Sequence, residues 1–182
     1  MHITSLQNPR IKSILRLKAS TRDRRRGGLF LVEGRDEIEL ALAAGNTPEV
    51  VISAPDLVRR DLDEAAGEKL TVSAPIFQKL SMRENPDGWL AVFPRPTTAA
   101  QDLQIGALPL LMVMEALEKP GNLGAILRTA DAARVDAVVV CDERADIYSP
   151  NVVRALRGAL FSVPVVELSS PKAAARLVGN LV

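Results

Sequence analysis

A segment in the second half of the chain combines glycines, an amide, a carboxylate and an arginine at a spacing suited to anion binding. Glu115 ends an apolar stretch, and Lys119–Gly124 leads into a predicted helix that carries Arg128. Glycines let a ligand approach the backbone closely, Asn122 can cap the helix, and a helix start favours negative charge. The segment is neither a Gly-Lys-Ser/Thr phosphate loop nor a three-glycine dinucleotide motif, and it suits equally well a capped strand-to-helix turn that binds nothing.

This helix is predicted to present Arg128 to solvent. Ile126, Ala130 and Ala133 are expected on its buried side, and Arg128 lies about 200° around the axis from Ile126. Glu115, at the end of a buried strand, needs a hydrogen-bond donor, for which a loop N–H and Arg128 are the candidates.

Strands alternate with helices along the whole chain, which predicts an α/β protein. In the first half we expect a helix capped by Asn8, further helices at 34–44, 55–66 and 75–80, and strands at 29–32, 50–52, 70–72 and 89–93. Residues 22–28 lack an apolar period and are predicted to form a basic loop. In the second half we expect strands at 110–114, 137–141 and 163–168, with helices at 124–133, 149–159 and 170–179. The right-handed crossover rule makes this half a wound parallel sheet.

Residues 94–101, Pro-Arg-Pro-Thr-Thr-Ala-Ala-Gln, have the composition of a linker. Prolines hold such a segment extended, and no apolar period crosses it. We therefore predict a first domain over 1–96, a linker over 97–107 and a second domain over 108–182.

Positive charge is concentrated at the start of the chain. The net charge of the 182 residues is +1, yet residues 1–35 contain nine Lys and Arg against two acids. Such a basic arm suits either a polyanionic partner such as nucleic acid or a solvated helix face followed by a basic loop. The basic residues expected to contact phosphates are Arg10, Lys12, Arg16, Lys18, Arg22, Arg24, Arg25 and Arg26.

The composition excludes several other kinds of protein. A single cysteine, Cys141, allows no internal disulfide and fits a reducing cytoplasm, and one cysteine with one histidine cannot form a Cys/His metal site. No apolar run reaches roughly 18 residues, so no membrane span is expected. The first eight residues lack the apolar stretch of a secretory signal.

Two segments of the second half resemble the SpoU (TrmH-type) RNA ribose 2′-O-methyltransferases, of the SPOUT superfamily. Glu115 followed by Lys119-Pro120-Gly121-Asn122-Leu123-Gly124-Ala125-Ile126-Leu127-Arg128 is similar to the first signature motif of that family. Tyr148-Ser149-Pro150-Asn151-Val152-Val153-Arg154 with Gly158-Ala159-Leu160-Phe161 is similar to the next one, although Leu156 stands where the family often has serine.

The first half resembles the substrate-binding domain that precedes the catalytic domain in the ribosomal-RNA branch of the family. The matching pieces are Asn8-Pro9-Arg10-Ile11-Lys12, Phe30-Leu31-Val32-Glu33-Gly34 and Asp87-Gly88-Trp89-Leu90-Ala91-Val92. The resemblance implies a small α/β RNA-binding domain, similar to kink-turn-binding ribosomal proteins, followed by a wound parallel-sheet α/β-knot domain. It also implies an RNA partner, most simply ribosomal RNA, and a homodimer.

The implied reaction transfers a methyl group from S-adenosylmethionine to a ribose 2′-hydroxyl. By resemblance, Arg128 holds the adjacent phosphate and stabilises the developing alkoxide. Arg128 is not expected to act as a base, because a guanidinium keeps its proton at neutral pH. Asn122 would orient Arg128 or the ribose, and Glu115 would fix the loop and Arg128 through a charged hydrogen bond. Arg154 would help hold RNA or the partner subunit.

Two segments of the family's catalytic domain, a Gly-x-Glu-x-x-Gly loop and a final Ser/Leu/Asn-rich motif, do not occur in this sequence. In the family they build most of the S-adenosylmethionine pocket and the knot, so the second domain is expected to be incomplete at its C-terminus and this chain alone to be inactive. A non-catalytic RNA-binding protein with a degenerate methyltransferase domain is the alternative. A nucleotide-binding metabolic enzyme is disfavoured by the basic arm and the missing phosphate loop.

Overall fold

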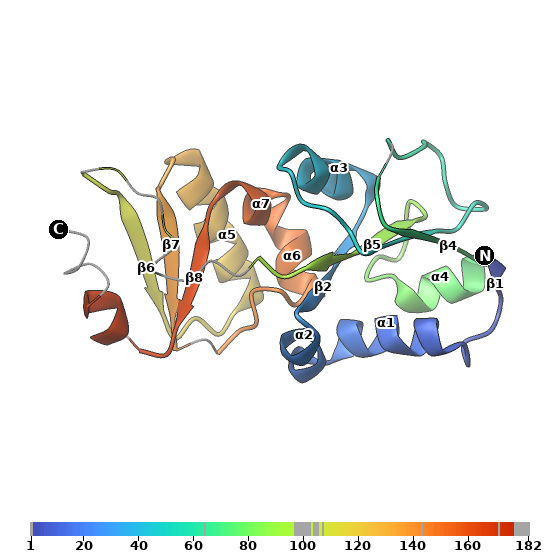
Figure 1. Cartoon of the computed structure of the whole chain (residues 1–182), viewed down its shortest axis with the longest axis horizontal. Coiled ribbons are helices and arrows are strands. Elements are labelled where there is room, and N and C mark those ends of the chain that lie inside the picture. Colours follow the sequence, from blue (N-terminus) through green and yellow to red (C-terminus); the bar gives the residue numbers. More distant parts are fainter. Residues whose placement is uncertain are drawn as a thin grey trace. The chain divides into compact units, whose positions relative to one another are not determined.

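Figure 1 shows the computed structural model of the chain, which describes residues 2–63, 65–96, 103, 106, 108–142, 144–170 and 172–176. The chain divides into two compact units. The first contains Met1–Arg95 and Tyr148–Arg154, and the second contains Pro96–Ile147 and Ala155–Val182. The prediction had placed residues 148–154 in the second domain (108–182), whereas in the structure they belong to the first unit. The predicted linker, 97–107, lies outside the described residues except for positions 103 and 106.

The first unit is built on a five-stranded mixed sheet of order β1-β4-β3-β5-β2. β1 pairs with β4, and β4 with β3, in parallel, whereas β5 runs antiparallel to both β3 and β2. The strands are β1 (His2–Ile3), β2 (Leu29–Glu33), β3 (Val50–Ser53), β4 (Glu68–Val72) and β5 (Trp89–Pro94). The four longer strands confirm the positions expected from their apolar runs.

Four helices flank this sheet: α1 (Pro9–Ala19), α2 (Thr21–Gly27), α3 (Arg35–Ala43) and α4 (Ala74–Leu80). Asn8 caps α1 as predicted, its side chain accepting a hydrogen bond from the Arg10 N–H at 2.9 Å. In Figure 1, α1 and α4 lie on one face of the sheet and α3 lies on the other.

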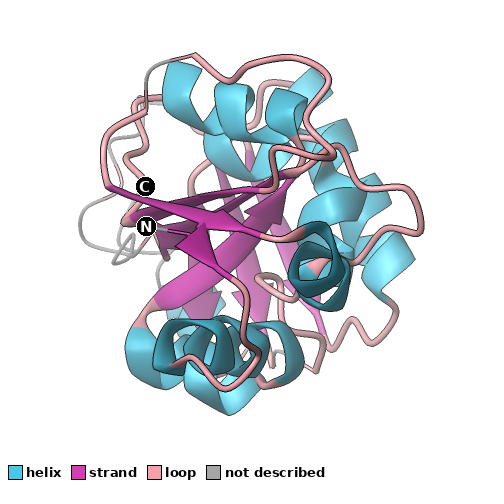
Figure 2. Ribbon diagram, turned by 90° about the vertical axis from the view of Figure 1, so that its right-hand side faces the viewer, coloured by secondary structure: helices cyan, strands magenta, loops and turns pink. Residues whose placement is uncertain are grey.

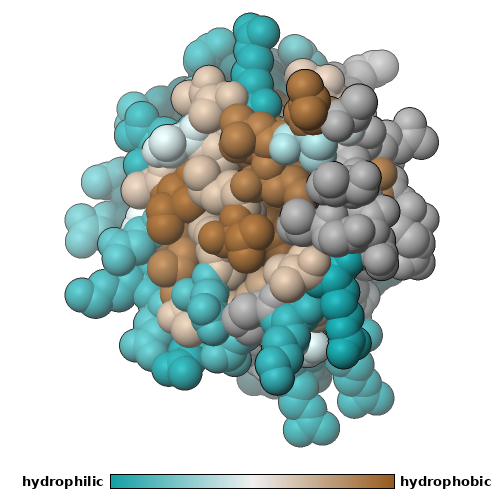
Figure 3. All heavy atoms as spheres, turned by 90° about the vertical axis from the view of Figure 1, so that its left-hand side faces the viewer, coloured by the Kyte–Doolittle hydropathy of each residue, from teal (hydrophilic) through white to brown (hydrophobic). Residues whose placement is uncertain are grey.

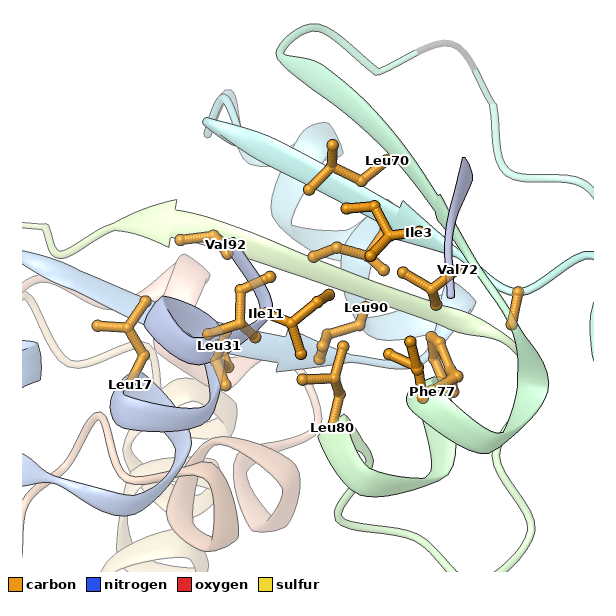
Figure 4. Close-up of a cluster of buried hydrophobic side chains, with 14 residues drawn as sticks. Ile3, Ile11, Leu17, Leu31, Leu70, Val72, Phe77, Leu80, Leu90 and Val92 are labelled. Atoms are coloured by element: carbon orange, nitrogen blue, oxygen red, sulfur yellow. The ribbon is translucent and has the colours of Figure 1, made fainter. Parts of the chain in front are cut away.

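Figure 4 shows the core between the sheet and the helices α1 and α4. Ile11, Ile14 and Leu17 recur at helical spacing along α1 and are all buried. They meet Phe77 and Leu80 of α4 and the alternate strand residues Leu31, Ile52, Leu70, Val72, Leu90 and Val92. Burying alternate strand residues fixes which face of each strand points inward, and this holds α1 in place.

Two predictions for the first unit are wrong. Of the predicted loop 22–28, residues 22–27 are helical and belong to α2, because the Ser20 hydroxyl caps the Asp23 N–H at 3.1 Å and the Arg24 side chain is buried. Residues 55–66 are turns and irregular chain in the described positions rather than a helix. There the Trp89 indole N–H donates to the Arg60 carbonyl at 3.0 Å, and Arg35 Nε donates to the Asp61 carbonyl at 2.6 Å. Carbonyls held in this way do not accept helical hydrogen bonds.

The second unit contains the predicted wound parallel sheet, with order β6-β7-β8. Its elements are β6 (Leu111–Glu115), α5 (Pro120–Ala132), β7 (Ala137–Cys141), α7 (Ala159–Ser162) and β8 (Val165–Leu168). It also contains the last two residues of α6 (Pro150–Leu156), whose first five residues belong to the first unit. The central strand β7 is buried along all five residues, as expected for a strand covered on both faces. The helix predicted over 149–159 is instead two helices, because Gly158 adopts a left-handed φ of 89° between them.

Helix α5 begins four residues earlier than predicted and buries a different stripe. Leu123, Leu127 and Ala130 face inward, whereas Ile126 is half-buried and Ala133 is exposed. The prediction of these two as core residues was wrong, but Arg128 is exposed as expected. No helix in the described part of the chain is long and apolar enough to cross a membrane.

β6 lies at an edge of its sheet, and β7 is its only strand neighbour among the described residues. Apolar side chains on and before this strand face solvent: Leu108 is 96%, Leu110 55% and Val113 48% exposed. Figure 3 shows apolar residues gathered on this side of the molecule. Figure 2, from the opposite side, shows helices on both sides of the strands of the first unit.

We predict that Arg24→Ala destabilises the first unit. The Arg24 guanidinium is 2% exposed and donates to the carbonyls of Leu17 and Lys18, which end α1, and to the Thr21 hydroxyl. Losing these charged hydrogen bonds leaves buried carbonyls unpaired and should lower the free energy of unfolding by about 1–3 kcal/mol in a urea titration. Arg22→Ala, at an exposed position of the same helix, is the control and should change it by less than about 0.5 kcal/mol.

Candidate active site and RNA-binding surface

Helix α5 lies close to Ala155, a residue of the second unit near the end of α6, and this contact places Arg128. Gly124 lies one turn before Arg128 on the same face of α5. A Cβ atom at Gly124 would lie 2.8 Å from the Cβ of Ala155, so only glycine allows this approach. The Arg128 guanidinium donates from Nη1 to the Ala155 carbonyl. This hydrogen bond fixes the Arg128 side chain next to Ala155. The sequence suggested that Gly124 lets a ligand approach the backbone. In the structure Ala155 packs against Gly124 instead.

The other two predicted catalytic residues lie near the start of the same helix. Asn122 is exposed in the first turn of α5 and does not cap it, since the N-cap is Lys119. Glu115 is exposed at the carboxyl end of β6. In the described part of the chain no hydrogen bond or ion pair joins Glu115 to Arg128, so the predicted charged contact is absent and Arg128 bonds to Ala155 instead.

The loops that follow β6 and β7 are tied to each other. Ala116 N–H donates to the Cys141 carbonyl, and Ala145 N–H donates to the Leu117 carbonyl, both at 3.1 Å. Arg144 forms an ion pair with Glu118 at 2.8 Å. The hydrogen bond with Glu118 and the charge of Asp142 raise the pKa of Arg144 further above its ordinary value. Ligands of wound parallel sheets bind beyond these strand ends. The ion pair between Glu118 and Arg144 was not predicted, because no signal in the sequence links these two residues.

Cys141 lies at the end of β7 and is fully buried. Burial raises the pKa of the Cys141 thiol above its usual value, and the charge of Glu115, its register neighbour on β6, raises it further. A raised pKa means that the thiolate forms only at higher pH, so at neutral pH Cys141 is an uncharged core thiol and not a nucleophile.

Arg24, Lys18 and Arg10, three of the eight basic residues predicted to contact phosphates, hydrogen-bond or pair with groups of the first unit. Arg24 is buried at the end of α1, which removes it from the surface and makes its prediction as a phosphate contact wrong. Lys18 Nζ donates to the carbonyls of Lys79 and Ser81 at the end of α4, at 2.9 and 2.6 Å. Arg10 forms an exposed ion pair with Glu68 at 2.6 Å.

The other five basic residues of the arm are exposed, and for them phosphate contact remains a prediction: Lys12, Arg16, Arg22, Arg25 and Arg26. They lie on α1 and α2, which the core and the buried Arg24 hold in place. The basic arm is thus a helical surface rather than a loose loop.

The segment Tyr148–Arg154 is packed within the first unit. Tyr148 is 2% exposed, makes an edge contact with Phe30 at 5.2 Å between ring centroids, and lies under the Arg95 guanidinium at 4.2 Å. Arg154 Nη1 donates to the Met82 carbonyl at 3.2 Å. Arg154 therefore has an intramolecular partner at the site where RNA or subunit contact was expected.

Among the described residues, no group of three or more His, Cys, Asp or Glu side chains is arranged to hold a metal ion.

Gly124→Ala should push α5 away from Ala155. The added methyl would overlap the side chain of Ala155, so we expect a loss of about 1–3 kcal/mol in the free energy of unfolding. Gly121→Ala is the matched control on the same helix, because a Cβ there meets nothing within 4 Å. It should be neutral or slightly stabilising in the same denaturant titration, and equal losses in both variants would contradict the contact.

Cys141 should resist thiol reagents in the folded chain. Because the thiol is buried and its pKa is raised, a disulfide reagent at pH 8 is expected to label it only as fast as the protein unfolds. Labelling should become immediate in 6 M guanidinium. Rapid reaction of the native protein would show that β7 is accessible.

Two family models match the chain, one for each half. The MRM3-like substrate binding domain matches residues 8–91, and the SpoU rRNA Methylase family matches residues 109–180.

Curated proteins with similar sequences carry related names. The chain is 30% identical over 170 residues to the 23S rRNA (guanosine(2553)-2′-O)-methyltransferase RlmP of Bacillus subtilis, covering 93% of this chain and 66% of that protein. It is 32% identical over 166 residues to the human mitochondrial rRNA methyltransferase 3, covering 87% of this chain and 39% of that protein. The chain therefore spans about two thirds or less of the length of these relatives.

Solved structures of similar proteins share the fold. The crystal structure of an RNA 2′-O ribose methyltransferase is 37% identical with a TM-score of 0.79, and the match covers 98% of this chain and 70% of that one. The SpoU methyltransferase AviRb from Streptomyces viridochromogenes, in complex with the cofactor AdoMet, is 26% identical with a TM-score of 0.85, covering 96% and 68%. With both halves matched in sequence and in structure, the chain belongs to the SpoU family of RNA methylases and carries an MRM3-like substrate-binding domain ahead of its methylase domain.

Proposed function

We propose that the protein methylates the 2′-hydroxyl of a ribose in ribosomal RNA. The observation that carries this proposal is the exposed Arg128, which the Ala155 carbonyl holds within the segment that matches the SpoU rRNA Methylase family. The substrate follows from the relatives, since those in Bacillus subtilis and in human mitochondria are both named as rRNA methyltransferases.

The chemistry requires a cation beside the ribose. A 2′-hydroxyl is a weak nucleophile, so it must be aligned with the methyl group and stabilised as its proton leaves. Only Nη1 of Arg128 is bonded to Ala155, which leaves the other guanidinium N–H groups to bind the adjacent phosphate and the developing negative charge. Asn122, exposed in the first turn of the same helix, would orient the ribose, and Glu115 would act on the loop after β6 rather than on Arg128.

S-adenosylmethionine would supply the methyl group when bound. In the described residues, β6 has a neighbouring strand on one side only, because the sheet runs β6-β7-β8. These residues therefore form only one wall of a binding site for S-adenosylmethionine at the ends of the strands. A crevice at a switch point of such a sheet needs a strand on each side. We therefore expect these 182 residues to bind S-adenosylmethionine weakly.

The remaining parts of the proposal concern assembly and location. We propose a cytoplasmic homodimer with an α/β-knot catalytic domain, as the family resemblance implies. The single cysteine supports the reducing compartment. The exposed basic residues of α1 and α2 would hold RNA through its phosphates, giving an affinity that falls with salt.

The test is transfer of labelled methyl groups from S-adenosylmethionine to ribosomal RNA by the full-length protein. Arg128→Ala should lower the rate about 10²–10³-fold, as the loss of one oxyanion-type donor does, while RNA affinity changes less than about twofold. Arg134→Ala, at an exposed residue just beyond α5, is the control and should retain full activity. Equal losses of methylation and RNA binding in Arg128→Ala would reject its catalytic role. RNA binding with no methyl transfer by the unsubstituted protein would favour the non-catalytic alternative.

A further inference from the structure

A hollow of about 450 Å³ opens on the surface of the first unit between α1, α2 and β2. Both helices contribute one face to it. On α1 the lining residues are Ser13, Arg16 and Leu17, and on α2 they are Asp23, Arg26 and Gly27. Each set follows the i, i+3, i+4 spacing of a single helix face.

Hydrogen bonds hold the helices α1 and α2 on either side of the hollow, and the space between them is empty. Ser20 caps α2, and the buried Arg24 ties α2 to the end of α1. A Cβ atom at Gly27 would meet nothing within 4 Å, so this helix position borders empty space. The hollow is therefore a feature of the packing of the two helices and not of a loop.

The lining combines apolar surface, cations and one carboxylate. Leu17 and the half-buried Leu29 give an apolar floor, and the exposed Arg16 and Arg26 stand at the rim. Asp23 is half-buried, and its carboxylate has no hydrogen bond or ion pair among the described residues. Asp23 lies in the first turn of α2, where the helix dipole favours a carboxylate, and a carboxylate does not add to the attraction for RNA phosphates.

We propose that this hollow binds one unstacked guanine base of the RNA, an inference that rests on the RNA-binding part of the proposed function. A carboxylate only accepts hydrogen bonds, and guanine is the one common base whose pairing edge offers two adjacent donors, N1–H and the 2-amino group. Asp23 accepts both, the base packs on Leu17 and Leu29, and Arg16 and Arg26 bind the flanking phosphates. Proteins select RNA sequence mainly by reading such unstacked bases, whereas phosphate contacts carry no sequence information.

The first experiment measures binding of the 182-residue chain to short labelled uridine-rich RNAs by fluorescence anisotropy. The RNAs differ only at one central position, which is guanosine, inosine or adenosine. We expect guanosine to bind about tenfold tighter than adenosine, the discrimination of one good bidentate contact, with inosine in between because it lacks the 2-amino group. Asp23→Asn should abolish this preference, and Asp56→Asn, at an exposed turn of the same unit, should retain it.

A second pair of variants tests the hollow itself. Gly27→Leu fills the space with a side chain whose Cβ meets no neighbour, so the helix should remain folded while the base is excluded. Ala19→Leu adds the same side chain at an exposed position outside the hollow. Arg26→Gln should weaken all three RNAs alike and reduce the salt slope by about one. Thermal melting establishes that each variant is folded.

The outcomes separate this inference from the proposed function. Loss of the guanosine preference in Asp23→Asn and Gly27→Leu, with overall RNA binding and both controls intact, supports the inference. Equal binding of all three RNAs by the unsubstituted chain, or a preference that survives in Gly27→Leu, overturns it and leaves the RNA methyltransferase proposal standing. No salt-dependent binding to any RNA would overturn both.

Discussion

The close approach of α5 to Ala155 is the constraint on which the candidate active site depends. Gly124 leaves room for Ala155, and one turn later Arg128 donates to the Ala155 carbonyl. A larger residue at 124 would move the carbonyl that holds the arginine. A long, exposed side chain such as arginine loses much conformational freedom when it is fixed, and a single hydrogen bond to a rigid helix supplies part of that order before any RNA arrives.

In the basic arm, some charged side chains hold the fold while others remain exposed. Arg24 and Lys18 place their charges on the carbonyl ends of α1 and α4, where they satisfy backbone groups and oppose the helix dipoles. This fixes the two basic helices against the sheet. The exposed arginines beside them, including Arg16 and Arg26, are then held on a rigid surface, which suits the reading of an RNA shape better than a mobile loop does.

Apolar runs predicted the strands, because several strands in both sheets are buried at consecutive residues, and helical apolar spacing predicted most helices. These patterns failed where polar side chains decide the backbone. The 22–28 segment has no apolar stripe, yet residues 22–27 are helical because Ser20 caps the helix and the Arg24 side chain is buried beneath it. The 55–66 segment has helical composition, but side-chain donors from Arg35 and Trp89 take its carbonyls. Likewise, the motif located Arg128, whereas its partner Ala155 lies 27 residues away and no local pattern links the two.

The most direct test of the account compares ribosomal RNA from cells with and without the gene. Ribose 2′-O-methylation protects the following phosphodiester from alkaline cleavage, so sequencing of alkali fragments maps every modified position. The account predicts that one protected ribosomal position is lost on deletion and restored by the intact gene but not by its Arg128→Ala form. Identical protection patterns with and without the gene would contradict it.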